Sequence, residues 1–170
     1  MTLLIVTIVV SMGISFLCSL SEACLLSLSM ADIAGLSEKK PRSGQLLKQM
    51  KEGVQKPIAA ILIVNNFSNI IGAAVSGTIF SDLFGSKWIG LFSFVFSLAI
   101  IQWAEYLPKT LGVLHNRALA VIIARPLAYI VHILNPLVFM LEQINRPFLR
   151  GAKYRSAVDA LSEISLLARY

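Results

Sequence analysis

Long apolar runs without a charged side chain are the feature of this sequence that most limits its fold. Met1–Ser21 and Ile58–Ser81 carry no charged side chain, and Trp88–Ala104 is uncharged up to Glu105. A helix of about 20 predominantly apolar residues is long enough to cross the roughly 30 Å hydrocarbon core of a bilayer. At 56% hydrophobic and 14% charged residues, the chain is too apolar for an ordinary soluble domain. The sequence therefore predicts an all-α integral membrane protein.

The basic residues indicate how the chain is oriented. We expect three transmembrane helices, at about 2–30, 58–81 and 88–112, and the positive charges gather between the first two: Lys39, Lys40, Arg42, Lys48, Lys51 and Lys56. The connection between the second and third spans offers only Asp82 and Lys87. Because cytoplasmic loops carry the excess of Lys and Arg, we expect the N-terminus outside, the C-terminus in the cytoplasm, and the plasma membrane as the location.

The stretch after the third span differs from the others. Residues at about 117–150 are apolar, but Arg125-Pro126, Asn135-Pro136 and Arg146-Pro147 interrupt them. A further crossing would put the basic residues after Arg146 outside, so we expect one or two amphipathic helices forming a belt on the inner membrane surface. Residues 1–150 are then the transmembrane transport domain, and 151–170 begin a truncated cytoplasmic helical region. The net charge of +6 fits contact with anionic lipid headgroups and not with nucleic acid.

Two carboxylates stand inside or beside the apolar runs. Glu22 follows the first run and Glu105 the third, and an ionisable group at membrane depth costs about 2.5–3.5 kcal/mol on insertion scales, which makes it a functional candidate. Pro108 lacks an N–H group, so it frees the backbone carbonyl of Ala104 and should kink or unwind the helix there. We expect Lys109 to neutralise Glu105 when no cation is bound.

Polar side chains on the first two spans complete a candidate set of ligands. Ser19 and Glu22 share a helical face with Ser15, and Asn65, Asn66 and Asn69 lie within one and a half turns of the second span. The alternative for these serines and asparagines is helix packing or interhelical hydrogen bonding. Together with the carboxylates they form an all-oxygen set, which suits Mg2+, Ca2+ or Na+ better than zinc or copper.

Three motifs resemble the transmembrane domain of the cyclin M/CorC family. They are Ser19–Ser29, with the pattern Ser-x-Ser-Glu, Ile63–Asn69, with Asn-Asn-x-x-Asn, and Ala104–Thr110, with Glu-x-x-Pro-Lys. The third motif is the most specific, although Ala104 stands where the family has glycine. The resemblance extends over nearly the whole chain, including the basic loop and the surface belt.

The resemblance implies a homodimeric, sodium-coupled Mg2+ exporter with three transmembrane helices per subunit. Carried over by position, the Mg2+ ligands are Ser21, Asn66, Asn69 and Glu105. Lesser candidates are Ser19, Glu22, Asn65 and the carbonyl of Ala104. Mg2+ is then the substrate ion and Na+ the coupling ion, and ATP is not expected to bind because the CBS domains of the family are absent from this sequence.

A second function remains open at this point. The chain could be a membrane cation sensor, or a dimerisation platform, that regulates another Mg2+ transporter without transporting ions itself. An intramembrane enzyme is disfavoured, because the sequence has no metalloprotease His/Glu spacing and no nucleophile elbow.

Overall fold

The computed structural model describes residues 1–149, all but a few of which are helical. The elements are α1 (Thr2–Ser27), α2 (Met30–Lys39), α3 (Pro41–Glu52), α4 (Gln55–Phe84), the 3-10 turn η1 (Ser86–Trp88), α5 (Ile89–Ala99), the π-helical segment η2 (Ile100–Tyr106), α6 (Leu107–Leu114) and α7 (Asn116–Leu149). The chain divides into two units, Met1–Val138 and Phe139–Tyr170. The helical region expected at 151–170 lies outside the described residues.

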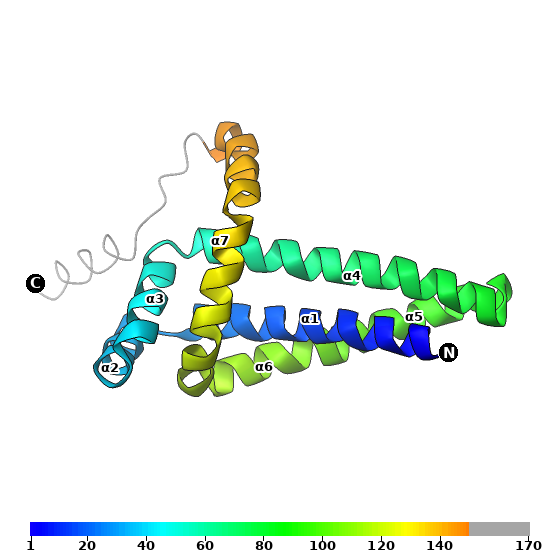
Figure 1. The fold of residues 1–170 in the computed structure, drawn as a ribbon, viewed down its shortest axis with the longest axis horizontal. Helices are drawn as coiled ribbons and strands as arrows, with labels where there is room; N and C mark the ends of the chain where they lie inside the picture. The colour runs from blue at the N-terminus through cyan, green and yellow to red at the C-terminus, as the bar shows by residue number, and fades with distance from the viewer. Residues whose placement is uncertain (150–170) are drawn as a thin grey trace, which may run out of the picture. The chain divides into compact units, whose positions relative to one another are not determined.

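The long helices of the first unit lie beside one another, as Figure 1 shows. Helix α1 packs against both α4 and the α5–η2–α6 segment. It runs antiparallel to α4 and in the same direction as α5–η2–α6 (Figure 1). These helices contain the three predicted spans, and the all-α membrane fold is confirmed. The first span is shorter than expected, because α1 ends at Ser27 and not near residue 30.

Four helical stretches, one more than the three spans expected, are long and apolar enough to cross a membrane by length and composition. The fourth is Asn116–Ile144, within α7. This helix continues through Pro126 and Pro136 as one element, so the prolines do not divide it in two. Up to Val138 it runs across α1 and α4 and not alongside them (Figure 1). Its placement as a surface belt stays a prediction.

Helix α2 follows α1 after a sharp break. Ser29 accepts a hydrogen bond from the Asp32 amide, while the Asp32 carboxylate accepts one from the Ser29 amide, so the two residues form a capping box. This motif satisfies two of the unpaired N–H groups at a helix start. The spacing Ser29-x-x-Asp32 is the sequence signal for the start of this helix. This start was missed in the sequence because the apolar run of α1 continues to Met30.

Lys51 of α3 contacts the C-terminal end of α1, just before this break. Its ammonium group donates hydrogen bonds to the carbonyls of Leu25 and Leu26, at 3.0 and 2.9 Å. These carbonyls belong to the last turn of α1, where a positive charge also complements the helix dipole. Burial lowers the pKa of Lys51 from its ordinary value of 10.5. A basic residue of the first loop therefore anchors the end of the first span.

The hydrophobic core of the first unit gathers at this same end of α1. Its buried members come from α1, α2, α3, α4 and the first half of α7, and they include Cys24, Leu25, Ile33, Leu47, Ile61 and Ala124. Cys18 and Cys24 are both buried and free. The core fixes the loop helices and α7 around the end of the spans.

Candidate cation site

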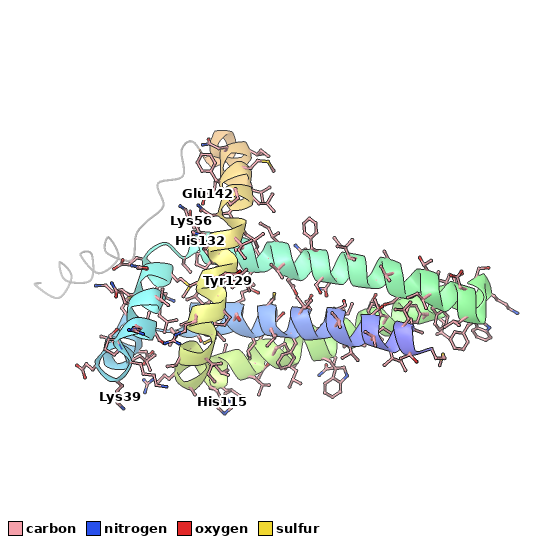
Figure 2. The ribbon with its side chains drawn as sticks, in the orientation of Figure 1. Lys39, Lys56, His115, Tyr129, His132 and Glu142 are labelled. Atoms are coloured by element: carbon pink, nitrogen blue, oxygen red, sulfur yellow. The ribbon has the colours of Figure 1, made fainter. Side chains whose placement is uncertain are left out.

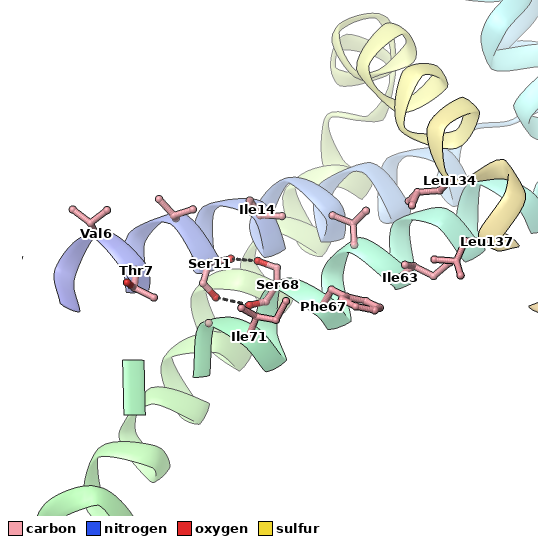
Figure 3. A pocket seen from close by; sticks show the side chains of 13 residues that line it. Val6, Thr7, Ser11, Ile14, Ile63, Phe67, Ser68, Ile71, Leu134 and Leu137 are labelled. Atoms are coloured by element: carbon pink, nitrogen blue, oxygen red, sulfur yellow. Dashed lines mark hydrogen bonds between the residues drawn. The ribbon is translucent and has the colours of Figure 1, made fainter. Parts of the chain in front are cut away.

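Polar side chains join α1 to α4 near the middle of the two helices. The hydroxyl of Ser15 donates a hydrogen bond of 2.6 Å to the side-chain oxygen of Asn65. One turn away, Ser11 donates to the carbonyl of Ser68, and Ser68 donates to the carbonyl of Ser11, both at 3.0 Å (Figure 3). Such bonds link helices where water is scarce. Asn65 is therefore already occupied in holding the two helices together.

Glycines allow α1 to approach both neighbouring helices closely. A Cβ atom at Gly72 of α4 would overlap the side chain of Ser11, and one at Gly112 of α6 would lie 2.7 Å from the carbonyl oxygen of Leu20. Small residues at such positions are typical of packed membrane helices. Gly72 and Ser76 are both buried, so these two residues pack within the chain itself.

Three buried side-chain oxygens lack a hydrogen-bond partner in the part of the chain that the structure describes. They are the hydroxyl oxygens of Ser19 and Ser76 and the side-chain oxygen of Asn69. A buried polar atom without a partner costs about 1–3 kcal/mol, so each calls for an explanation such as a bound water or ion. Ser19 and Asn69 are both among the residues predicted as ligands.

Glu105 lies in an irregular segment of the third span. Residues Ile100–Tyr106 form π-helical turns, and the N–H of Leu107 bonds to the carbonyl of Gln102, five residues earlier. The local irregularity predicted next to Pro108 is therefore confirmed, in the form of widened turns. Such turns occur frequently at functional sites. Ala104 is fully buried here, while Glu105 is half-buried; whether the carbonyl of Ala104 serves as a ligand stays a prediction.

The contacts between helices define the height of Glu105 in the bundle. Gly112 lies against Leu20 and Cys24 of α1, and Glu105 precedes it by seven residues. At a rise of about 1.5 Å per residue, Glu105 lies about 10 Å from Gly112 toward the N-terminal end of α1. This is the level of Ser15. Ser15 is bonded to Asn65. Ser19 and Asn69 then lie one turn to either side of that level, so residues from three helices share a layer about two turns thick.

Ser21 and Asn66 differ from these residues in their surroundings. The Ser21 hydroxyl donates to the carbonyl of Leu17 on its own helix, at 2.7 Å. Asn66 is exposed, next to the buried Asn65. The structure does not bring either side chain to the buried oxygens of Ser19 and Asn69, and their roles as ligands stay predictions.

Glu22 makes the ion pair that was expected of Glu105. The ammonium group of Lys109 lies 3.4 Å from the Glu22 carboxylate, because α6 packs beside the second half of α1. The expected pairing of Lys109 with Glu105 one turn earlier is not the one observed. Glu22 and Lys109 together line a hollow of about 450 Å³ at the end of the spans near the basic loop.

A larger cavity, of about 600 Å³, lies between α1, α4 and α7 and is apolar. Its walls include Val10, Ile14, Ile63, Phe67, Leu134 and Leu137, with the Ser11–Ser68 pair at one side (Figure 3). The predicted ligands Ser19, Asn66, Asn69 and Glu105 do not line it. This cavity therefore does not have the chemistry of a cation site.

The described residues offer a cation near Glu105 mainly oxygen ligands. Among the described residues, no group of three or more His, Cys, Asp and Glu side chains could hold a metal ion. A cation here would depend on hydroxyl, amide and carbonyl oxygens around one carboxylate. Such a set suits hard cations.

These features define the class of protein: an all-α integral membrane protein with oxygen-bearing side chains between its helices. Comparison with known sequences gives the family. The family described as Cyclin M transmembrane N-terminal domain matches residues 5–167, and the chain belongs to this family.

Curated relatives support the assignment. The chain is 34% identical over 154 residues to the UPF0053 protein sll1254 of Synechocystis, covering 91% of this chain and 44% of that protein. It is 26% identical over 130 residues to the UPF0053 inner membrane protein YfjD of Escherichia coli, covering 76% of this chain and 30% of that protein. A chloroplastic DUF21 domain-containing protein of Arabidopsis thaliana, At1g55930, is 27% identical over 149 residues, which cover 86% of this chain and 23% of the relative. The chain thus spans less than half the length of these relatives.

Proposed function

We propose that this chain is the membrane domain of a Mg2+ transporter, which exports Mg2+ in exchange for Na+. One observation carries the proposal: the side-chain oxygens of Ser19 and Asn69 are buried and have no partner among the described residues, and they lie about one turn to either side of the level of Glu105. Carboxylate, amide and hydroxyl oxygens are ligands for hard cations, and Mg2+ takes six oxygens at about 2.0–2.1 Å. The resemblance of the three motifs to the cyclin M/CorC family supports Mg2+ as the substrate ion.

The ligand set follows the sequence motifs. Asn69 and Glu105 are the central ligands. Ser19, whose hydroxyl has no partner among the described residues, lies about two turns from Asn69 along the bundle and joins them only when the helices rearrange. Ser21 and Asn66 join only when the helices rearrange, since the Ser21 hydroxyl is bonded to Leu17 and Asn66 is exposed. Asn65, Glu22 and the carbonyl of Ala104 shape the site or serve Na+.

The path of the ion follows from the same geometry. The hollow beside Glu22 and Lys109 is the cytoplasmic entrance, about two turns from the level of Glu105. The π-helical turns of η2 provide the flexible element, because non-helical backbone at membrane depth is tolerated where it lines a cavity. Rearrangement there would open the site to one side of the membrane and then to the other.

The assembly and its orientation are part of the proposal. The basic loop that holds α2 and α3 faces the cytoplasm of the cell, so the N-terminus is outside and the C-terminus inside. The transport unit is a homodimer in the plasma membrane. Helix α7 lies on the inner surface as the predicted belt, and three helices cross.

Flux measurements distinguish transport from the alternative of a cation sensor or dimerisation platform. Purified protein in liposomes should move Mg2+ down its gradient, and faster with an opposing Na+ gradient. Glu105→Gln should abolish this flux, whereas Glu38→Gln, an exposed carboxylate of α2, should leave it unchanged. Mg2+ binding without flux would instead support the sensor, and equal flux in both variants would rule out Glu105 as a ligand.

A further inference from the structure

Two adjoining hollows separate α3 from α7. The first, of about 470 Å³, is lined by Arg42, Gln45, Leu46, Gln49 and Arg125. The second, of about 500 Å³, shares Leu46 and Gln49 with it and extends to Met50, Gly53, Lys56, Pro57, Ala128, Val131, His132 and Asn135. Because the two share a wall, we treat them as one feature, the α3–α7 groove. Each hollow falls within the roughly 300–1,000 Å³ of typical ligand sites.

The α3–α7 groove is positively charged. Arg42 and Arg125 face its first hollow, and Lys56 and His132 its second; Figure 2 labels Lys56 and His132 where α7 crosses α4. Among the residues that the structure describes, no carboxylate lines either hollow. The groove thus collects cationic groups on a concave surface without an acidic residue to balance them.

Three other cations of the described residues are paired with carboxylates. Arg117 binds Asp32, Lys48 binds Glu52 and Lys109 binds Glu22. Arg42, Lys56 and Arg125 take part in no ion pair within residues 1–149. An anion in the groove would supply the charge that these three residues lack.

The neighbouring surface of α7 indicates what kind of anion would bind. Ile122, Tyr129 and Ile133 lie one and two turns apart along one side of α7 and are 69%, 68% and 54% exposed, beside the flank that carries Arg125 and His132. A helix with an apolar side next to a basic side is typical of a membrane surface. The floor of the second hollow is also partly apolar, through Met50, Pro57 and Val131.

We propose that the α3–α7 groove binds the phosphate headgroup of an anionic phospholipid of the cytoplasmic leaflet, whose acyl chains lie along the exposed apolar side of α7. Arg42 and Arg125 bind the phosphate, since the guanidinium group matches its geometry. Lys56 and His132 contact the remainder of the headgroup. This proposal uses the orientation given above but does not depend on which ion the protein transports.

Native mass spectrometry of the purified full chain tests the proposal. The probes are phosphatidylglycerol and phosphatidylcholine with identical acyl chains, which differ in net charge. The wild type should bind phosphatidylglycerol more tightly, and Arg42→Gln with Arg125→Gln should weaken this binding by about tenfold or more, since each basic residue near a membrane surface contributes about 1 kcal/mol. Equal affinity of the wild type for both lipids would overturn the proposal.

A matched control isolates the groove from general surface charge. Lys39→Gln with Lys40→Gln removes the same charge from the end of α2, where Figure 2 labels Lys39, and should change the affinity by less than about twofold. A loss equal to that of the arginine pair would contradict a specific site. If circular dichroism shows that the arginine variant loses its helices, Lys56→Gln with His132→Gln replaces it. This second variant should also weaken the binding of phosphatidylglycerol.

A soluble competitor distinguishes a lipid from a free phosphate ester. Glycerol 1-phosphate carries the headgroup chemistry of phosphatidylglycerol without acyl chains. Millimolar glycerol 1-phosphate should leave most phosphatidylglycerol bound, because it cannot occupy the apolar side of α7. Complete displacement would show that the groove binds a soluble phosphate ester, and the lipid proposal would be wrong.

Discussion

Ser15 donates a buried hydrogen bond of 2.6 Å to the side-chain oxygen of Asn65, while Ser19, one turn further along the same face of α1, has a hydroxyl oxygen without a partner in residues 1–149. Both serines are fully buried. The bond from Ser15 joins α1 to α4, whereas the role proposed for the Ser19 hydroxyl is that of an ion ligand. The two proposed roles can be separated by mutation.

Alanine substitutions at the two serines should have opposite effects on stability. Ser15→Ala leaves the buried oxygen of Asn65 without its donor and should lower the free energy of unfolding by about 1–3 kcal/mol. Ser19→Ala removes a hydroxyl that has no partner, so the free energy of unfolding should stay unchanged or rise by up to about 1 kcal/mol. Denaturant unfolding in detergent without divalent cations measures both. A larger loss for Ser19→Ala than for Ser15→Ala would contradict this assignment.

A double-mutant cycle tests the ion pair between Glu22 and Lys109, which lie 3.4 Å apart. Glu22→Gln and Lys109→Gln should show a coupling energy of about 1 kcal/mol or less, because half of the Lys109 side chain is exposed and such pairs are weak. A parallel cycle of Glu105→Gln with Lys109→Gln should give a coupling near zero in the absence of cations. A larger coupling energy between Glu105 and Lys109 than between Glu22 and Lys109 would favour the pairing expected from the sequence.

Acidification should weaken the start of α2. Hydrogen bonds from the Ser29 hydroxyl and the Ser29 amide, with a further contribution from Arg117, hold the pKa of Asp32 below its ordinary value of 3.8. The ionised carboxylate is favoured in the folded state, so its contribution to stability is complete above the unfolded pKa and is lost as the pH falls through the lower, folded pKa.

The comparison of wild type with Asp32→Asn measures this contribution. Wild type should have the higher melting temperature at pH 7, and the difference should shrink as the pH is lowered from about 4 to about 2. Glu38→Gln on the same helix serves as the control and should show no such convergence. A difference that stays constant across this range would mean that the charge of Asp32 does not stabilise the fold.

Much of the fold could be predicted from the sequence. Uncharged runs longer than a bilayer is thick indicate spans directly, and Pro108 indicated the irregular segment that the structure has at Ile100–Tyr106. Pro41 is the first residue of α3, where its fixed φ angle is favourable. Helix α2 was missed because the apolar run continues past the end of α1, and only the Ser29–Asp32 capping box marks the boundary.

The site was predictable as a set of residues but not as a set of contacts. Helical spacing put Ser15, Ser19 and Glu22 on one face, yet it could not tell that Ser15 would bond to Asn65 and Ser19 to no described residue. It also paired Lys109 with Glu105, because i, i+3 and i, i+4 neighbours are the pairs that a single helix defines. The packing of α6 against α1 gave Lys109 a different partner, Glu22, and packing between helices is not encoded in spacing along one of them.

The central claim is that buried oxygens of the three spans hold Mg2+, and calorimetric titration of Mg2+ into the purified protein tests it most directly. Asn69→Ala should weaken Mg2+ binding by about tenfold or more, since even residues that merely support metal ligands cost that much when removed. Ser19→Ala should weaken it as well, while Ser97→Ala, an exposed serine of α5, should leave the affinity unchanged. Affinities equal to wild type in both Asn69→Ala and Ser19→Ala would contradict the account.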